Sequence, residues 1–300
     1  MAVPDADLPT LVKRQDHLQI LRYIRAYHLR EPEMVLKHGK ALLGDTWSSK
    51  RKIKDEAARL AALEQVTLAA LDLQQHDTAK QCLDCLRDAI GDDSSVRYRV
   101  LLGRCCEAAG DMEGANKVYD EILESHPSNA VVRRRKYCME DDPVIRVSLL
   151  NEYLQYNLSD SAGWFELSRL KLSLGDAEGA AFALEEVVLG CPLEVSAHIH
   201  LAEAYATIGG IEHLALARKH MAQALELDPT NKRALWGLVM VSHAYLILQN
   251  SKASVDDHSK EVAKQLISYG ADKLWKHVYK GETKMLERVR TLLKQYTQDL

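Results

Sequence analysis

Apolar residues recur at helical spacing along most of this chain, in runs that come in pairs. Each pair begins a new unit, and the units start at Leu60, Val96, Ala130, Ser161, Val195 and Lys232. These starts lie about 34 residues apart, the length of two helices with their connecting turns. No alternation of apolar and polar residues predicts a strand. The pattern therefore predicts an all-α chain of repeated helix-turn-helix units.

The unit from 161 to 192 shows which residue types recur. Its bulky and small positions are filled in order by Trp164, Leu167, Ser168, Ala180, Leu184 and Pro192, with Gly175 and Asp176 at the turn. This order is typical of tetratricopeptide repeats, whose small residues let neighbouring helices approach closely. We therefore predict a tetratricopeptide-repeat (helix-turn-helix) superhelical solenoid. Such arrays bind other proteins along a concave surface, so the fold itself points to a scaffold.

Two units depart from the pattern. The unit at Val195 has three additional residues around 209–212, and we expect them in its loop because loops tolerate insertions. The unit at Ala130 is weak, because Arg133 to Lys136 occupy positions where packing residues belong. We assign 1–58 to a helical N-terminal lead-in, 59–254 to the repeat array and 255–300 to a helical C-terminal cap.

Composition agrees with a helical scaffold and limits its partners. Hydrophobic residues make up 47% of the chain, and only 7 Pro and 15 Gly interrupt it. The formal net charge of -4 gives no global basic field, so we expect no nucleic-acid binding. Two short basic clusters, at 50–54 and 133–136, are either solvated helix faces or docking patches for a partner or for lipid headgroups.

The sequence shows neither a secretory signal nor a membrane span. Its N-terminal stretch lacks the continuous apolar region of a signal peptide. The most apolar segment, 234–248, is shorter than the roughly 20 residues that a bilayer requires. We therefore expect a cytoplasmic chain whose 6 cysteines are reduced.

Candidate chemistry is sparse. Cys82 and Cys85 form one Cys-x-x-Cys pair, but a structural zinc site needs four ligands, so we expect both thiols to pack within a helix. His213 and His220 share a helix face, yet no acidic residue is placed to complete a site with them. No phosphate-binding loop and no nucleophile motif is present. We expect no metal, no cofactor and no enzymatic activity.

Ten residues are candidates for partner binding. Positions 2, 5, 9, 12 and 13 of each first helix normally face the concave surface of such arrays, and here they include Arg97, Arg104, Arg134, Phe165, Arg169, Ile199, Glu203, Arg233, Trp236 and Met240. Exposed Arg with aromatic residues and Met is typical of protein interfaces. An alternative is that Trp236 and Met240 simply pack under the C-terminal helices. Arrays that bind the C-terminal carboxylate of a chaperone carry Asn at position 6 of the first helix. No unit of this chain has Asn at that position, which argues against a co-chaperone.

Several stretches resemble one family of tetratricopeptide proteins. They are Leu150-Asn151-Glu152-Tyr153-Leu154, Trp164 with Glu166-Leu167, Ala180-Ala181-Phe182, Gly209-Gly210-Ile211-Glu212, Ala222-Gln223-Ala224-Leu225 and Arg233-Ala234-Leu235, with weaker similarity as far as Ala62 and Ser251-Lys252-Ala253-Ser254. In these residues the chain is similar to the second-subunit family of the endoplasmic reticulum membrane protein complex. The Gly-Gly stretch is specific, because an unrelated array is not expected to share it. Residues 1–58 and 133–142 do not resemble the family closely.

The resemblance implies a non-catalytic scaffold of an insertase that places transmembrane segments, including those of tail-anchored proteins, in the endoplasmic reticulum membrane. The implied partners are other subunits of that complex: the cytosolic tails of its membrane subunits and a cytosolic metalloprotease-like subunit. Membrane contact is then indirect, and the protein is peripheral on the cytosolic face. The alternative function is a soluble tetratricopeptide adaptor of another multi-protein assembly. An enzyme is a more distant alternative, since catalytic groups can come from residues far apart in sequence.

Overall fold

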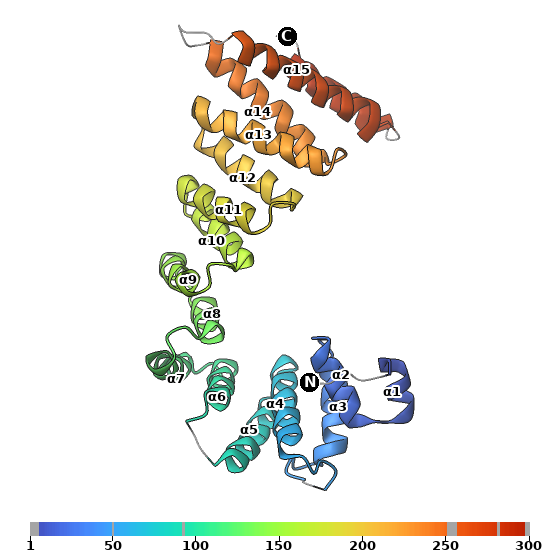
Figure 1. The fold of residues 1–300 in the computed structure, drawn as a ribbon, viewed down its shortest axis with the longest axis vertical. Coiled ribbons are helices and arrows are strands. Elements are labelled where there is room, and N and C mark those ends of the chain that lie inside the picture. Colours follow the sequence, from blue (N-terminus) through green and yellow to red (C-terminus); the bar gives the residue numbers. More distant parts are fainter. Residues whose placement is uncertain (1–5, 50, 92–93, 251–256, 281–282, 298–300) are drawn as a thin grey trace. The chain divides into compact units, whose positions relative to one another are not determined.

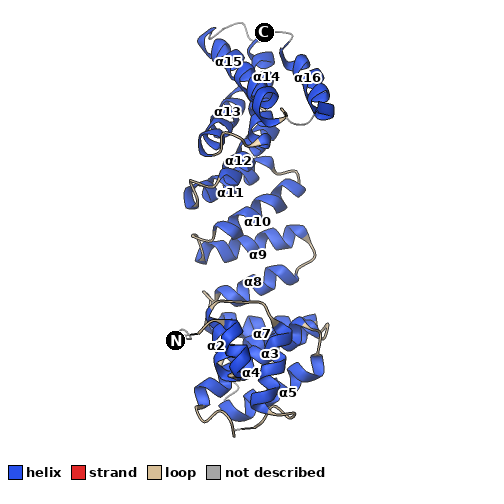
Figure 2. Ribbon diagram, turned by 90° about the vertical axis from the view of Figure 1, so that its right-hand side faces the viewer, coloured by secondary structure: helices blue, strands red, loops and turns tan. Residues whose placement is uncertain are grey.

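The structure is a computed structural model that describes residues 6–49, 51–91, 94–250, 257–280 and 283–297. The described residues form sixteen α-helices and one π-helical segment and contain no strand (Figures 1 and 2). The elements are α1 (Leu8–Arg14), α2 (His17–Ala26), α3 (Pro32–Leu43), α4 (Glu56–Asp72), α5 (His76–Ile90), α6 (Val96–Ala108), α7 (Met112–Ser125), α8 (Ala130–Met139), α9 (Pro143–Tyr156), α10 (Ser161–Ser173), α11 (Ala177–Gly190), α12 (Val195–Ile208), α13 (Gly210–Leu227), α14 (Lys232–Asn250), α15 (Asp257–Lys273), η1 (Leu274–Val278) and α16 (Thr283–Thr297).

The predicted repeats are pairs of consecutive helices. Five of the six predicted starts are first residues of helices: Val96 begins α6, Ala130 begins α8, Ser161 begins α10, Val195 begins α12 and Lys232 begins α14. The remaining helix, α4, begins at Glu56 and so extends further towards the N-terminus than predicted. The prediction of an all-α tetratricopeptide fold is confirmed.

One device turns the chain within a repeat. Gly175 has a φ of +80°, a left-handed conformation that glycine adopts without steric cost. Asp176 then caps α11, because its carboxylate accepts a hydrogen bond from the backbone N–H of Gly179 at 2.8 Å. A side chain on Gly179 would overlap that carboxylate. The repeat at 96 uses the same three positions, filled by Gly110, Asp111 and Gly114.

The additional residues of the repeat at 195 lie in a helix, so the expectation of a longer loop was wrong. α12 ends at Ile208 and α13 begins at Gly210, which leaves one residue between them. α13 has 18 residues, whereas α7 and α11, its counterparts in other repeats, have 14 each. Gly209 and Gly210 permit the abrupt reversal through φ values of +77° and +76°. Ile211 and Leu214 pack against the core, and this burial stabilises the longer helix.

The chain divides into two compact units, 1–139 and 140–300. In the first unit, one core cluster runs from Leu11 to Leu101 and joins the N-terminal helices to the first repeat. In the second, one cluster runs from Ala181 to Leu293 and joins the last repeats to the C-terminal helices. The domain boundary at 58/59 stays a prediction. The boundary at 254/255 lies outside the described residues. The same holds for Lys50 of the first basic cluster and for the stretch 251–254 that resembles the family. It also holds for three parts of the predicted cap, 255–256, 281–282 and 298–300.

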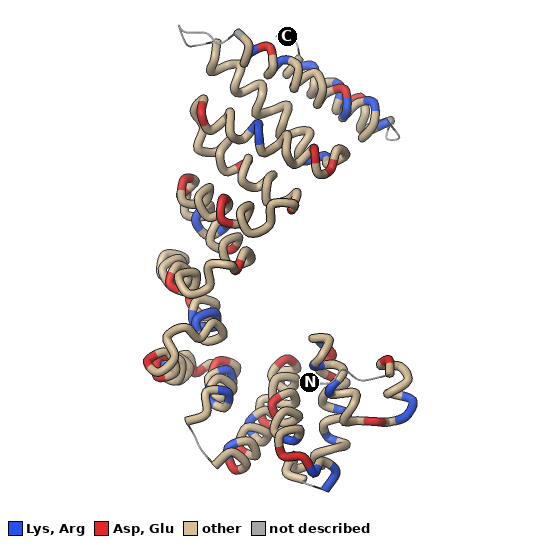
Figure 3. The backbone as a smooth tube through the Cα atoms, in the orientation of Figure 1, with Lys and Arg blue, Asp and Glu red and all other residues tan. Residues whose placement is uncertain are grey.

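The boundary between the units falls inside the weak repeat, between α8 and α9. The basic run lies on α8, where Figure 3 shows the backbone coloured for Lys and Arg, and two of its residues contact acidic residues of the same unit. Arg135 Nε donates to Glu107 Oε1 at 3.0 Å, and Lys136 pairs with Asp120. Polar contacts thus add to the apolar packing of Val132 against α7, and they occupy positions that apolar residues hold in the other repeats.

Candidate protein-binding groove

A groove of about 620 Å³ lies in the second unit where α12, α13 and α14 meet. Its lining residues are Glu203, Ala206 and Thr207 of α12, Leu214 and Met221 of α13, and Arg233, Trp236, Gly237, Met240, Val241 and Ala244 of α14. Four of the ten predicted residues are among them: Glu203, Arg233, Trp236 and Met240. The volume is within the range of sites that enclose a small ligand or a few side chains of a peptide.

Most of the groove is lined by apolar or small side chains. The only Lys, Arg, Asp or Glu residues of α14 are Lys232 and Arg233 in its first turn, so the rest of this helix carries no formal charge (Figure 3). Gly237 makes room for Met221, whose terminal methyl group fills the space that a Cβ at position 237 would need. Met221 is unbranched and adaptable, as Met residues in binding surfaces often are. The groove therefore fits an apolar segment better than a charged one.

A bidentate ion pair lies at the charged edge of the groove. Arg233 Nε donates to Glu203 Oε1 at 2.6 Å, and Arg233 Nη2 donates to Glu203 Oε2 at 2.5 Å. This paired geometry fixes the direction of both side chains. The pair contributes little to folding, because both side chains are substantially exposed. Its effect is to cancel two charges beside an apolar surface.

A chain of contacts connects α10 to this ion pair. The Phe165 ring meets the His200 ring edge-to-face with centroids 5.1 Å apart, and His200 Nδ1 lies 3.5 Å from Arg233 Nη2. Burial, followed by the positive charge of Arg233, lowers the pKa of His200, so this imidazole is neutral and can accept a hydrogen bond. Phe165 is thereby held against the groove edge. Arg169, one turn further along α10, is exposed.

Trp236 has two roles in the packing. It lines the groove, and its Nε1 lies 3.4 Å from the hydroxyl oxygen of Tyr279 in the C-terminal segment. Met240 lines the groove and is 51% exposed. Packing under the C-terminal helices therefore accounts for part of Trp236, while the side chain of Met240 is accessible to a partner.

The other predicted residues lie elsewhere. Ile199 is 3% exposed, so its prediction as a surface residue was wrong: α12 packs against α11, α13 and α14, and this position is covered. Arg97, Arg104 and Arg134 belong to the first unit. Arg97 pairs there with Glu64, Arg104 is half-buried on α6, and Arg134 is exposed on α8. None of these three lines the groove.

The positional rule for first helices covers Ala206, Thr207 and Ala244, at positions 12, 13 and 13, but it does not cover Gly237 or the groove residues of the second helix. Leu214 and Met221 come from the second helix of the repeat, and Ala206, Gly237 and Ala244 are small. A signal for them was present in the sequence. Gly237 and Ala244 lie seven residues apart, hence on one face of α14, where two small residues leave room for a ligand.

The sequence offered Cys82 with Cys85, and His213 with His220, as possible metal ligands, and all four lie among the described residues. Among the described residues, no cluster of three or more His, Cys, Asp and Glu is arranged to hold a metal ion. Burial raises the pKa of the Cys82 thiol to about 12 and that of Cys105 to about 11, which makes both poor nucleophiles. Within the same ranges, no helix combines the length and the apolar character needed to cross a bilayer.

Comparisons with known proteins agree with the resemblance seen in the sequence. Residues 94–226 match the family described as the EMC2 TPR-like repeat domain. The chain is 36% identical over 233 residues to ER membrane protein complex subunit 2 of Xenopus tropicalis, covering 77% of this chain and 75% of the relative. It is 29% identical over 234 residues to the protein of the same name in Dictyostelium discoideum, covering 73% and 71%. The C-terminal part of a TPR repeat-containing protein from Cytophaga hutchinsonii superposes with a TM-score of 0.49 at 11% identity, covering 87% of this chain and 93% of that one. By its identity to these curated relatives, the chain belongs to the ER membrane protein complex subunit 2 family.

Proposed function

We propose that this chain is a non-catalytic scaffold subunit of the ER membrane protein complex, peripheral on the cytosolic face of an insertase for transmembrane segments, including those of tail-anchored proteins. Its relatives are named as the second subunit of that complex, which supports the setting. The repeat fold supports a binding role, since such arrays present long surfaces to other proteins. The observation that carries the proposal is the apolar groove between α12 and α14, with its accessible Met240.

The groove is proposed to take an apolar segment from another subunit. The cytosolic tails of the membrane subunits are the first candidates, and a cytosolic metalloprotease-like subunit is a second. An apolar groove favours side chains that leave water on binding, and the Arg233–Glu203 pair beside it offers hydrogen bonds to polar groups of the segment. Attachment to the membrane then runs through these partners.

Matched substitutions on α14 test this role. Met240 is 51% exposed inside the groove, and Ile247 is 57% exposed outside it, so Met240→Glu and Ile247→Glu introduce the same charge at equally exposed sites of one helix. Each tagged variant would replace the endogenous chain in cells, and the complex would be purified in detergent and quantified by mass spectrometry. Loss of an interface anchor costs about 2 kcal/mol, so Met240→Glu is expected to reduce recovery of the other subunits severalfold. Ile247→Glu is expected to leave it unchanged.

Two results would count against the proposal, and a third would call for a second pair of variants. Equal recovery with both variants would remove the groove from the interface. Recovery of a different assembly with the unmodified chain would favour the alternative of a soluble adaptor. Equal loss with both variants, together with reduced helicity, would indicate a folding defect, and Trp236→Ala would then be compared with Ile247→Ala.

A further inference from the structure

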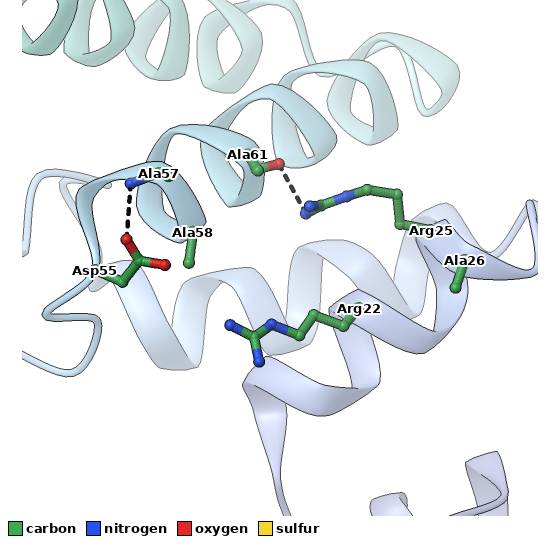
Figure 4. Close-up of a pocket in the computed structure, with 7 residues that line it drawn as sticks. All are labelled: Arg22, Arg25, Ala26, Asp55, Ala57, Ala58 and Ala61. Atoms are coloured by element: carbon green, nitrogen blue, oxygen red, sulfur yellow. Dashed lines mark hydrogen bonds between the residues drawn. The ribbon is translucent and has the colours of Figure 1, made fainter. Parts of the chain in front are cut away.

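A second pocket lies in the first unit, between α2 and the N-terminal turns of α4 (Figure 4). Its volume is about 310 Å³, and its lining consists of Arg22 and Arg25, Asp55 and four alanines. This is the lower end of the size range of ligand sites, so the pocket suits one side chain or one chain terminus rather than a cofactor. None of the residues predicted for partner binding lines it.

The two arginines of the pocket have no carboxylate partner. Arg25 Nη2 donates to the backbone carbonyl of Ala61 and to Gln65 Oε1, both at 3.0 Å and both uncharged. Arg22 makes no hydrogen bond or ion pair with any described residue. Burial lowers the pKa of Arg25, and the positive charge of Arg22 adds to this effect while Glu64 opposes it. Two like charges thus share one partly desolvated space.

Carboxylates of this region are committed to other groups. Asp55 caps α4 by accepting from the backbone N–H of Ala57 at 3.2 Å, Glu56 pairs with Arg59 at 2.6 Å, and Glu64 pairs with Arg97. Among the described residues, Glu64 acts on Arg25 from a distance, but no carboxylate hydrogen-bonds to Arg22 or Arg25. A guanidinium that is partly removed from water gains most from an ionised, fork-shaped acceptor.

We propose that this pocket binds a carboxylate of a partner protein, carried by an acidic side chain or by a chain terminus, between the guanidinium groups of Arg22 and Arg25. The formal charge of the lining is +1, from two arginines and Asp55, and it matches a monoanion. A phosphate dianion is disfavoured, because the carboxylate of Asp55 also lines the pocket, at the start of α4. The methyl groups of the four alanines contact the carbon atoms next to the carboxylate. The site belongs to the other unit from the groove, and the inference does not rest on the function proposed for the groove.

The test is a titration of the full chain, carrying ¹⁵N-labelled arginine, with small carboxylates at constant ionic strength set by sodium chloride. N-acetylglycine imitates a chain terminus, N-acetylglutamate α-methylamide imitates an acidic side chain, and inorganic phosphate is the third probe. The side-chain Nε–H signals of Arg22 and Arg25 are followed by NMR. We expect both signals to shift saturably with at least one carboxylate, and the tighter of the two carboxylates identifies the source.

Variants at Arg22 make the assignment specific. Arg22 makes no hydrogen bond with any described residue, so Arg22→Gln is expected to retain the fold while weakening carboxylate binding about tenfold or more. Arg22→Lys keeps the positive charge but lacks the fork-shaped guanidinium. Its affinity for the carboxylate is expected to lie between those of the unmodified chain and Arg22→Gln. Arg14→Gln, on the exposed end of α1, is the matched control and should bind like the unmodified chain. The inference is overturned by shifts that do not saturate, by shifts that persist in Arg22→Gln, or by phosphate binding more tightly than both carboxylates.

Discussion

Buried leucines hold the helices of neighbouring repeats together at the scale of single residues. Leu167 on α10 is 1% exposed, and Leu172 on the same helix is 41% exposed. A charge at the first site has no counter-ion and no water, whereas a charge at the second is solvated. In a repeat array this local loss spreads, because each helix pair is stabilised mainly by its neighbours.

Leu167→Asp is therefore expected to destabilise the chain by about 3 kcal/mol or more, and to lower helicity beyond its own repeat. Leu172→Asp should change stability by less than about 0.5 kcal/mol. Circular dichroism with urea titration measures both. Wild-type helicity and midpoint for Leu167→Asp would show that α10 is not coupled to its neighbours.

His220 stacks on His198 in the second unit, and it is expected to make the stability of the chain depend on pH. His198 Nε2 lies 3.0 Å from the carbonyl oxygen of Pro192 and donates to it, since a carbonyl can only accept. The neutral His198 ring then accepts at Nδ1 from Nδ1–H of His220, at 3.1 Å. Burial, then the neighbouring His198, lowers the pKa of His220; Glu185 opposes this effect and Lys219 adds to it. The folded state therefore favours a neutral His220.

Acid is expected to destabilise the chain through this pair. A lowered pKa in the folded state means that the unfolded chain binds the proton first, so stability is complete above the unfolded value near 6.5 and falls as the pH drops below it. His220→Phe keeps an aromatic ring without the titration and should flatten the dependence between about pH 7 and pH 5. His76→Gln, at an exposed site on α5, is the control and should leave the dependence unchanged. Urea midpoints measured across this range check both.

Helix caps fix the ends of the repeat helices at the scale of elements. Asp176 accepts from the backbone N–H of Gly179 and pairs with Lys171 at 3.0 Å, and the backbone hydrogen bond, followed by Lys171, lowers the pKa of Asp176. The ion pair is exposed and contributes little, so the cap is the main contribution of this side chain. The left-handed Gly175 before it sets the direction in which α11 starts.

Asp176→Ala is expected to destabilise the chain by about 1 kcal/mol, because the first turn of α11 loses its side-chain acceptor. Asp176→Asn keeps an oxygen acceptor without the charge and should recover most of that loss. Thermal unfolding of the three proteins at one pH distinguishes the cap from the ion pair. Equal losses in both variants would assign the effect to the Lys171 pair instead.

At the scale of the whole molecule, charges of both signs are interspersed, and some of the basic residues are paired. Arg135 and Lys136 of the second basic cluster pair with Glu107 and Asp120, which leaves less free positive charge for an anionic surface. The net charge of -4 acts in the same direction. Attraction to an anionic leaflet amounts to about 1 kcal/mol per free basic residue, so it is weak for this chain.

The purified chain is therefore expected to stay with the soluble fraction when floated with protein-free liposomes, including anionic ones at physiological salt. In cells it is expected to sediment with endoplasmic reticulum membranes, through its partners. Flotation gradients measure binding of the purified chain to liposomes, and cell fractionation measures its association with membranes in cells. Efficient flotation of the isolated chain would identify the basic clusters as lipid-binding sites, and a soluble chain in cells with an intact complex would contradict the proposed membership.

The helical repeats and the family were determined by the sequence itself. Helix pairs repeat because small and large residues recur at spacings fixed by helix geometry, and this signal is local; it placed the starts of α6, α8, α10, α12 and α14 correctly. It also marked the turn at Gly175 and Asp176, whose conformations depend on neighbouring residues alone. The Gly-Gly stretch at 209 helped to identify the family. It did not reveal that a longer helix, α13, begins at Gly210.

Only the tertiary structure decided which surfaces are open. Ile199 and Met240 both fit the positional rule for an exposed face. Ile199 is nevertheless buried, because its helix α12 packs against α11, α13 and α14, whereas Met240 on α14 is accessible. The groove needs residues from three helices, and the Arg22–Arg25 pocket brings α2 against the start of α4 although α3 lies between them in the sequence. Exposure depends on which distant segments pack together, and that packing is a sum over many contacts that a local pattern does not contain.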